Sequence, residues 1–182
     1  MNIGIDIDDT ITSTFEYMMP YVADFFGLDY AVLKKEQISY SNLPAMARER
    51  LLDFAKATFD STAASTPAKE HAAEVIRAWK EEGHRITIIT GRSNAFYTDC
   101  YKTTEEELEN CHIVYDKLIC TMDKKRACME EGIDLLIDDS VRNLEGAKEL
   151  GIRTILFDSP ANKDDREFER VFSWEELREL VK

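Results

Sequence analysis

A chain of 182 residues is long enough for one buried core with a small insertion, but too short for two full-sized domains. The composition, 44% hydrophobic and 32% charged, is typical of a water-soluble globular protein. The net charge of −13 argues against nonspecific binding to a nucleic-acid polymer or an anionic membrane, because both favour a basic surface. It leaves open a small phosphorylated ligand, which a few local cations or a metal can hold.

No segment combines a basic start with an apolar run, and none approaches about eighteen consecutive apolar residues. We therefore expect neither a signal peptide nor a membrane span. The four cysteines, Cys100, Cys111, Cys120 and Cys128, contain no CxxC pair, so neither a zinc knuckle nor a thioredoxin-like motif is predicted. These features together indicate a cytoplasmic protein with free thiols.

The chain opens with a strand pattern, Ile3–Ile7, that carries three carboxylates at its end. In an extended chain Asp6 and Asp8 point to the same side, and Asp9 follows. Like charges this close repel and raise each other's pKa values, so such groups are usually kept together by a divalent cation or a shared proton. The alternative is an acidic turn that caps the next helix.

The next segment, residues 12–66, is predicted to be helical. Its first part carries an apolar stripe at helical spacing, formed by Phe15, Met18, Met19, Val22, Phe25 and Phe26. A second helical pattern runs from Pro44 to Phe59, after a loop rich in Ser, Asn and Tyr. Because no strand pattern intervenes, we expect a helical insertion between the first strand and the rest of the sheet.

From residue 67 onward, strand and helix patterns alternate. The predicted strands are Arg85–Ile89, His112–Tyr115, Ile133–Ile137 and Arg153–Phe157, and the helical patterns between them end at Gly83, Gly132 and Gly151. The end of the chain predicts a short strand and a helix capped by Ser173 with Glu176. This order favours a parallel α/β sheet of about five strands covered by helices, with ligands at the carboxyl ends of the strands.

Four polar signals stand at predicted strand ends or helix starts. They are Asp6-x-Asp8-x-Thr10, Thr90-Gly91-Arg92, Lys124 or its neighbour Lys125, and Asp138-Asp139. Each alone has a structural explanation, as a strand end, a solvent-exposed lysine pair or a helix cap. Their joint occurrence on one edge of one sheet is much harder to obtain by chance.

This ordered set resembles the four motifs of the haloacid dehalogenase (HAD) superfamily of phosphatases. The resemblance implies a Rossmann-like core of residues 1–11 and 67–182 and a small all-helical C1 cap of residues 12–66. It also implies a phosphomonoester hydrolase in which Asp6 attacks phosphorus to form an aspartyl phosphate, while Asp8 acts as general acid and then as general base.

The resemblance further implies a Mg²⁺ cofactor, held by Asp6, Asp138 and the main-chain carbonyl of Asp8, with Asp139 supporting these ligands. The residues that would bind the substrate phosphate are Thr90, Gly91, Arg92 and Lys124. Lys125 and even Lys117 remain alternatives to Lys124, which we favour for its position at a helix start. Many family members carry glycine where this chain has Asp9, and Asp tolerates unusual turn dihedrals.

Within the superfamily, the Thr90-Gly91-Arg92 triplet, the sequence Ile-Asp-Asp-Ser at 137–140 and the ending Ser173–Leu177 resemble the 5′(3′)-deoxyribonucleotidase group. This implies a nucleoside monophosphate substrate, with its base against Phe15 or Tyr17. The alternative is a phosphatase for a sugar phosphate or another small metabolite. A receiver-like signalling module also uses clustered Asp, Thr and Lys, but its motifs come in a different order. The oligomeric state is not predicted.

Overall fold

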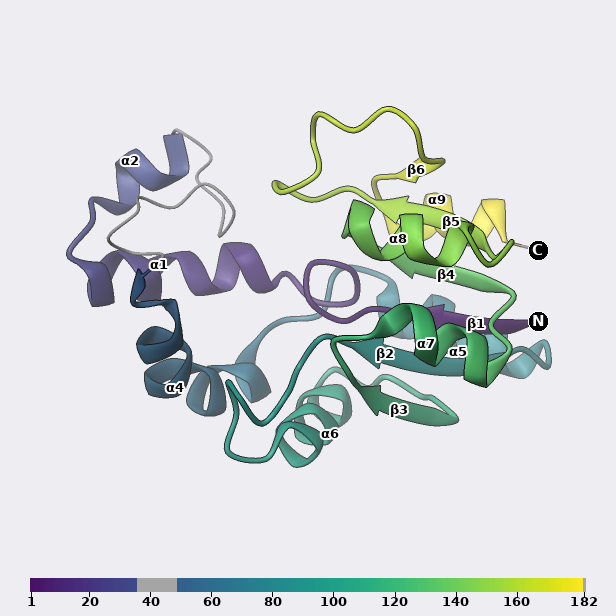
Figure 1. Cartoon of the computed structure of the whole chain (residues 1–182), viewed down its shortest axis with the longest axis horizontal. Coiled ribbons are helices and arrows are strands. Elements are labelled where there is room, and N and C mark those ends of the chain that lie inside the picture. The colour runs from purple at the N-terminus through teal and green to yellow at the C-terminus, as the bar shows by residue number, and fades with distance from the viewer. Residues whose placement is uncertain (36–48, 182) are drawn as a thin grey trace.

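The computed structural model describes residues 1–35 and 49–181, and its centre is a six-stranded parallel sheet (Figure 1). The strands are β1 (Asn2–Ile5), β2 (Arg85–Thr90), β3 (Lys117–Cys120), β4 (Leu135–Asp138), β5 (Arg153–Phe157) and β6 (Arg170–Val171). Their order across the sheet is β3-β2-β1-β4-β5-β6, and every neighbouring pair is parallel. The predicted parallel α/β class is confirmed.

Helices cover both faces of the sheet (Figure 1). One face packs against α5 (Ala72–Glu81) and α9 (Trp174–Leu180), and the other against α7 (Lys124–Glu131) and α8 (Val141–Lys148), while α6 (Cys100–Asn110) lies beside β3. Each face has its own buried apolar cluster. Because both faces are buried, the central strands are continuous apolar runs instead of alternating ones.

The inserted segment is helical where the structure describes it, with α1 (Thr14–Phe26), α2 (Tyr30–Lys35), α4 (Leu51–Thr62) and the 3₁₀ turn η1 (Ala63–Ser65). α1, α2 and α4 lie to one side of the sheet (Figure 1). They form a separate apolar cluster that includes Met18, Met19, Val22, Ala23, Leu33 and Phe54. The predicted helix start at Pro44 lies outside the described residues, and α4 continues three residues beyond Phe59.

The two ends of the insertion lie side by side. The Ser13 amide donates to the Pro67 carbonyl at 3.0 Å, and the Lys69 amide donates to the Ile11 carbonyl at 2.7 Å. Thr12 and Ala68 form an antiparallel bridge between these bonds. The helical segment is therefore joined to the rest of the chain through one short pair of strands, next to Asp8.

The predicted strand His112–Tyr115 is wrong. His112 adopts a left-handed backbone with φ of 57°, and the Ile113 amide returns to the Leu108 carbonyl at 2.9 Å, so these residues close α6. Ile113 is buried there against the core, which accounts for its apolar character. Pairing with β2 begins only at Lys117, so the strand lies five residues further on.

The sequence predicts free cysteines and no membrane span. No helix in the described ranges is both long and apolar enough to cross a membrane. All four cysteines lie within those ranges, and all four are free.

The closing helix α9 ties the end of the chain to the loop that follows β1. As predicted, the Ser173 hydroxyl accepts the Glu176 amide at 3.2 Å and caps the helix. The next residue, Trp174, is buried against Trp79 and Phe157, and its indole N–H donates to the Thr10 carbonyl at 3.0 Å. This contact holds the turn that carries Asp8 against the body of the protein.

Replacing Trp174 with Phe should lower the free energy of unfolding by about 2 kcal/mol, because the buried Thr10 carbonyl loses its donor and a small cavity opens. Urea unfolding measures this change. The control Phe172→Leu alters a side chain that is 64% exposed and should shift the free energy by less than about 0.5 kcal/mol. Equal stability of Trp174→Phe and wild type would contradict the structural role given to the indole.

Candidate active site

Asp6 and Asp138 meet because β1 and β4 are neighbours in the sheet. Ile5 is in register with Ile137, and the Asp6 amide donates to the Ile137 carbonyl at 3.0 Å. The chain proceeds from β1 outward through β2 and β3 and then returns to the other side of β1 with β4, so the two carboxylates lie at the topological switch point. In parallel α/β sheets this point opens into the ligand-binding crevice.

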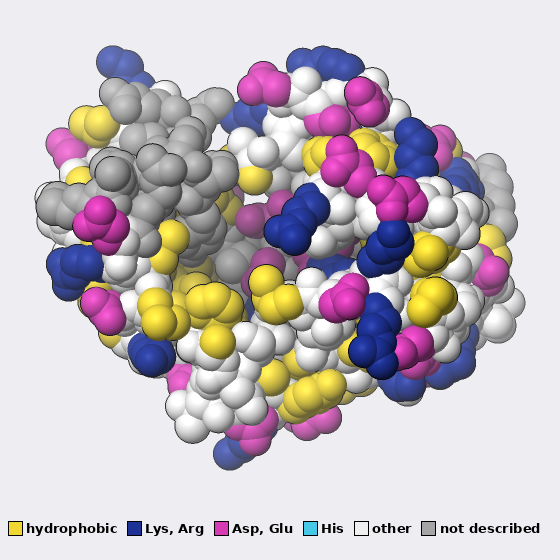
Figure 2. Space-filling model, in the orientation of Figure 1, with side chains coloured by type: hydrophobic (Ala, Val, Ile, Leu, Met, Phe, Trp, Pro, Cys, Tyr) yellow, Lys and Arg dark blue, Asp and Glu magenta, His cyan; other side chains and the backbone are white. Residues whose placement is uncertain are grey.

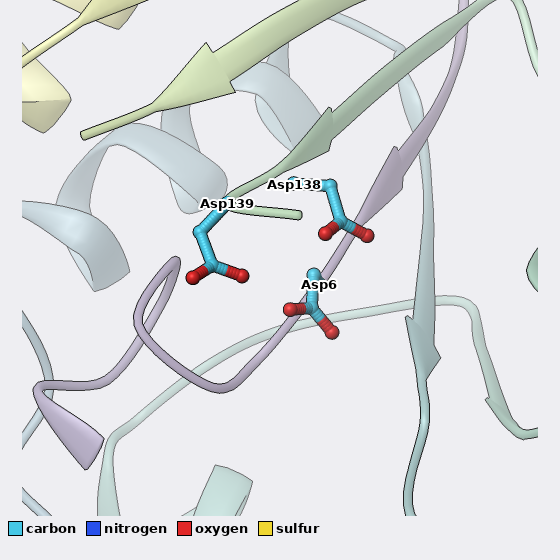
Figure 3. Close-up of side chains that lie close together, drawn as sticks. All are labelled: Asp6, Asp138 and Asp139. Atoms are coloured by element: carbon cyan, nitrogen blue, oxygen red, sulfur yellow. The ribbon is translucent and has the colours of Figure 1, made fainter. Parts of the chain in front are cut away.

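Three carboxylates converge at this point. Oxygen atoms of Asp6, Asp138 and Asp139 lie within 4.8 Å of one another, and Figure 3 shows the three side chains directed toward a common space. The motif resemblance implies only a supporting position for Asp139, whereas its carboxylate lies as close as those of Asp6 and Asp138. The Asp8 side chain lies outside this cluster, so any contribution of Asp8 to it comes from the main chain.

Among the three candidate lysines, only Lys124 reaches the acidic cluster. Its ammonium is buried, with 5% of the side chain exposed, and donates to Asp6 at 2.5 Å and to Asp138 at 2.7 Å. Lys125 pairs with Glu149 at the surface, and Lys117 pairs with Glu131. The first position of α7 therefore points into the site and the second points away.

Burial dominates the electrostatics of the cluster. It raises the pKa of Asp6 to about 7, since the Lys124 ammonium compensates only in part and the charges of Asp138 and Asp8 add to the effect. Burial, together with the charges of Asp6, Asp138 and Asp9, holds the pKa of Asp139 well above its usual value. One ammonium is too little positive charge for three carboxylates, which favours a bound proton or a cation.

Asp8 has a different environment. Its carboxylate accepts hydrogen bonds from Arg92 Nη2 at 2.8 Å, from Arg92 Nε at 3.2 Å and from the Thr14 hydroxyl at 2.9 Å. Burial raises the pKa of Asp8, but the Arg92 guanidinium outweighs this effect and the net pKa lies below its usual value. Arg92 is itself buried and also donates to Glu107 on α6, a residue that the sequence analysis missed.

Asp9, the third acid of the opening motif, is the turn residue. Its backbone has φ of 60°, and its carboxylate accepts the Phe15 amide at 2.8 Å at the start of α1. The helix-capping alternative therefore describes Asp9, while Asp6 and Asp8 face the site.

Two further polar residues complete the edge. Thr90 ends β2, and its buried hydroxyl has no hydrogen-bond partner among the described residues. Asn143, which the sequence analysis also missed, donates to both carboxylate oxygens of Asp138 at 3.1 Å. Its signal in the sequence is an amide side chain in the first turn of the helix that follows the acidic pair.

A cavity of about 500 Å³ lies between the sheet edge and the inserted helices, a volume suited to a small molecule. Figure 2 shows a hollow with acidic side chains inside it. The polar end is lined by Asp6, Asp8, Asp9, Gly91, Arg92, Lys124, Asp139 and Asn143, and the apolar end by Phe15, Met18, Leu51, Ala55, Phe59, Phe96 and Tyr97. Tyr17 is outside this lining and packs against Tyr21 instead.

The fold is shared with phosphatases. It superposes on D,D-heptose 1.7-bisphosphate phosphatase from B. bronchiseptica, solved with magnesium and phosphate, with a TM-score of 0.59 and 12% identity over 100% of this chain and 98% of that one. The four motifs on one sheet edge, with the match of the whole chain to a nucleotidase family model and the nucleotidase relatives described next, show that the protein is a phosphoric monoester hydrolase of the haloacid dehalogenase superfamily.

The chain belongs to the family described as 5′ nucleotidase, deoxy (Pyrimidine), cytosolic type C protein, whose model matches residues 1–182. "Putative nucleotidase YqfW" of Bacillus subtilis (strain 168) is 28% identical over 177 residues, which cover 96% of this chain and 90% of that protein. "Putative 5′(3′)-deoxyribonucleotidase" of Chlorobaculum tepidum is 25% identical over 185 residues, which cover 99% and 89%. The resemblance drawn from the motifs is confirmed.

Lys124→Met should destabilise the protein by about 3–5 kcal/mol near pH 8, because it leaves Asp6 and Asp138 buried without their cation. Without the ammonium the folded-state pKa of Asp6 rises further above its unfolded value, so the loss grows as pH rises and shrinks near pH 5, where the Asp6 carboxyl binds a proton. Urea unfolding at both pH values measures it.

Lys125→Met is the matched control, since that ammonium pairs only at the surface, and it should cost less than about 1 kcal/mol at either pH. A loss in Lys124→Met that is the same at pH 5 and pH 8 would contradict the electrostatic role of Lys124.

Proposed function

We propose that this protein is a cytoplasmic, Mg²⁺-dependent 5′(3′)-deoxyribonucleotidase that hydrolyses nucleoside monophosphates through an aspartyl phosphate. The observation that carries the proposal is the cluster of Asp6, Asp138 and Asp139 beside Lys124, at the polar end of a cavity whose other end is apolar. The family match and the names of the two relatives support the choice of a nucleotide.

The chain divides in this proposal into a core of residues 1–11 and 67–182 and a helical cap of residues 12–66. The paired segments at residues 11–13 and 67–69 support this boundary, as does the separate apolar cluster of α1, α2 and α4. The core carries all four motifs, and the cap contributes much of the apolar wall of the cavity. The cap then selects the leaving group, while the core performs the chemistry.

Mg²⁺ fits the acidic cluster. It prefers oxygen ligands, and the carboxylates of Asp6 and Asp138 with the main-chain carbonyl of Asp8 would hold it, with Asp139 within reach. Burial raises the pKa of Asp6, the charges of Asp138 and Asp8 add to this effect, and a cation beside the carboxylate would offset both. When bound, Mg²⁺ supplies the positive charge that keeps Asp6 ionised and offsets repulsion between this carboxylate and the phosphate.

In the first step a carboxylate oxygen of Asp6 forms a bond to phosphorus, and the ester P–O bond breaks. The Asp8 carboxyl gives its proton to the departing alkoxide. Asp8 must be protonated for this step, and the negative charge of an incoming phosphate raises its pKa against the effect of Arg92. The products are the aspartyl phosphate on Asp6 and the free nucleoside.

In the second step the Asp8 carboxylate takes a proton from water, and the water oxygen forms a bond to phosphorus. The bond between phosphorus and the Asp6 oxygen breaks, which releases inorganic phosphate and restores both carboxyl groups to their starting states. One residue thus serves as acid and then as base.

The phosphate oxygens are bound in this proposal by the Thr90 hydroxyl, the Gly91 amide and the Lys124 ammonium. The unpartnered Thr90 hydroxyl supports this, because a buried polar group without a partner is costly unless a ligand satisfies it. Gly91, Arg92 and Lys124 line the cavity, yet each of the three nitrogens of Arg92 already donates to a carboxylate. In this proposal Arg92 therefore has two roles, since it orients Asp8 and also contributes to substrate binding.

The base of the nucleotide lies in this proposal against Phe15, in the apolar end of the cavity. Aromatic side chains bind flat heterocycles by stacking and by excluding water. Phe59 and Phe96 line the same end and provide further aromatic surface. A sugar phosphate, whose hydroxyl groups require polar partners, is less well matched to this wall.

Phosphate release from deoxynucleoside monophosphates tests the activity, and Asp6→Asn should lower kcat by about a thousandfold or more because no nucleophile remains. Asp134→Asn is the control: it alters an exposed acid at the opposite end of β4 and should retain wild-type turnover. Robust turnover by Asp6→Asn would contradict the mechanism. Faster hydrolysis of sugar phosphates than of nucleotides in the same panel would contradict the substrate.

Mg²⁺ at about a hundred times its Kd should raise the thermal unfolding midpoint by about 5–10 °C, because binding adds about 2.7 kcal/mol to the stability of the folded state. Differential scanning fluorimetry measures the shift, and excess chelator should reverse it. Asp138→Asn should lose most of the shift, whereas Asp134→Asn should keep it. A shift of equal size in Asp138→Asn would place the cation elsewhere.

A further inference from the structure

Glu107 is a buried acid for which the proposed chemistry has no direct use. It lies on the inner side of α6 with no exposed surface, one turn beyond Thr103 and Thr104 and next to Leu108. Its Oε2 accepts a hydrogen bond from Arg92 Nη1, and its Oε1 has no hydrogen-bond partner among the described residues. Burial of a carboxylate is energetically costly unless the group is paired. The hydrogen bond from Arg92 is therefore the interaction that explains why an acid stands at this position.

That contact places Arg92 between two carboxylates. Nη1 faces Glu107, while Nη2 and Nε both donate to Asp8, at 2.8 Å and 3.2 Å. The guanidinium carbon also lies 5.6 Å from the centre of the Tyr97 ring. Because a guanidinium is planar, holding one edge on Glu107 fixes the direction in which the other edge meets Asp8.

Asp8 has few other constraints. Within the described ranges its carboxylate accepts two hydrogen bonds from Arg92 and one from the Thr14 hydroxyl. The bidentate pair with Arg92 therefore sets the plane of the Asp8 carboxyl. Glu107, on α6, is not among the residues that line the cavity. It can therefore affect the orientation of the Asp8 carboxyl only through Arg92.

We propose that Glu107 is a positioning residue, which holds Arg92 in the orientation that aims the Asp8 carboxyl at the leaving-group oxygen. This inference rests on the proposed function, in which Asp8 protonates that oxygen. Small errors in the aim of a proton donor reduce proton transfer much more than they reduce substrate binding.

The loss of activity expected when Glu107 is replaced depends on the leaving group of the substrate. A deoxyribonucleoside is a poor leaving group and needs the proton from Asp8, whereas the nitrophenolate of p-nitrophenyl phosphate departs with little help. The ratio kcat/KM covers steps up to leaving-group departure, so it excludes the later hydrolysis that both substrates share. Loss of aim should therefore reduce kcat/KM for the nucleotide and largely spare the aryl ester.

The experiment compares wild type with Glu107→Gln, which keeps the shape and an acceptor for Arg92 but removes the charge that holds the guanidinium. We expect kcat/KM for a deoxynucleoside monophosphate to fall about tenfold or more, mostly through kcat, and that for p-nitrophenyl phosphate to change less than about threefold. Glu106→Gln, at the adjacent position and 54% exposed, is the matched control and should leave both values unchanged.

A double-mutant cycle provides the second measurement. If Glu107 acts through Asp8, Glu107→Gln should cause no further loss of nucleotide kcat/KM in an Asp8→Asn background, because the group that it positions is already absent. Should Glu107→Gln fail to fold, Glu107→Asp, which keeps the charge but shortens the side chain, replaces it in both measurements.

An equal fall for both substrates, no fall for the nucleotide, or independent effects in the double variant would each overturn the inference. These outcomes differ from failure of the proposed function, in which the wild-type protein hydrolyses neither ester or Asp6→Asn retains turnover.

Discussion

The site depends on carboxylates that the pairing of strands in the sheet brings close together. The register of β1 with β4 brings Asp6 beside Asp138 at a buried edge, whatever their charge. Such a cluster is unfavourable without compensation, and the Lys124 ammonium at the start of α7 provides it in part. The remaining deficit of positive charge supports the cation site proposed at this edge, because a bound cation would lower the energy of the folded protein there.

The carboxyl groups of Asp6 and Asp8, only two residues apart, have pKa values shifted in opposite directions. Burial among other acids raises the pKa of Asp6, whereas the Arg92 guanidinium holds that of Asp8 below its usual value. The difference comes from their partners, since Asp6 lies beside Asp138 and Asp139, whereas Asp8 pairs with Arg92. These different environments support the separate roles proposed for two chemically identical groups.

The inserted helices contribute apolar side chains to the cavity beside the acidic edge. Phe15, Phe59 and Phe96 line the cavity with apolar surface, and charges beside an apolar surface act more strongly on a bound ligand than charges surrounded by water. The same helices contact the motif loops, since Phe59 on α4 packs against Tyr97, which in turn lies beside Arg92. The wall and the charged residues are therefore parts of one packed unit.

Local patterns in the sequence determined the fold class and most of the motif edge. Strand runs that end in polar residues and helices that end in glycine are properties of neighbouring residues, so they predicted the parallel sheet, the helical insertion and the positions of Asp6, Thr90 and Asp138. The strand at His112–Tyr115 was mispredicted because burial of Ile113 in a helix-closing turn produces the same apolar pattern as a strand.

Only the tertiary structure decided which of several similar side chains face the site. Lys124 and Lys125 are adjacent in sequence but point about 100° apart on a helix, so packing of α7 on the sheet selects one of them. Glu107 is one of three consecutive glutamates, and the docking of α6 turns this one toward Arg92. Such choices depend on contacts between residues far apart in the chain, and periodicity along the sequence carries no information about those contacts.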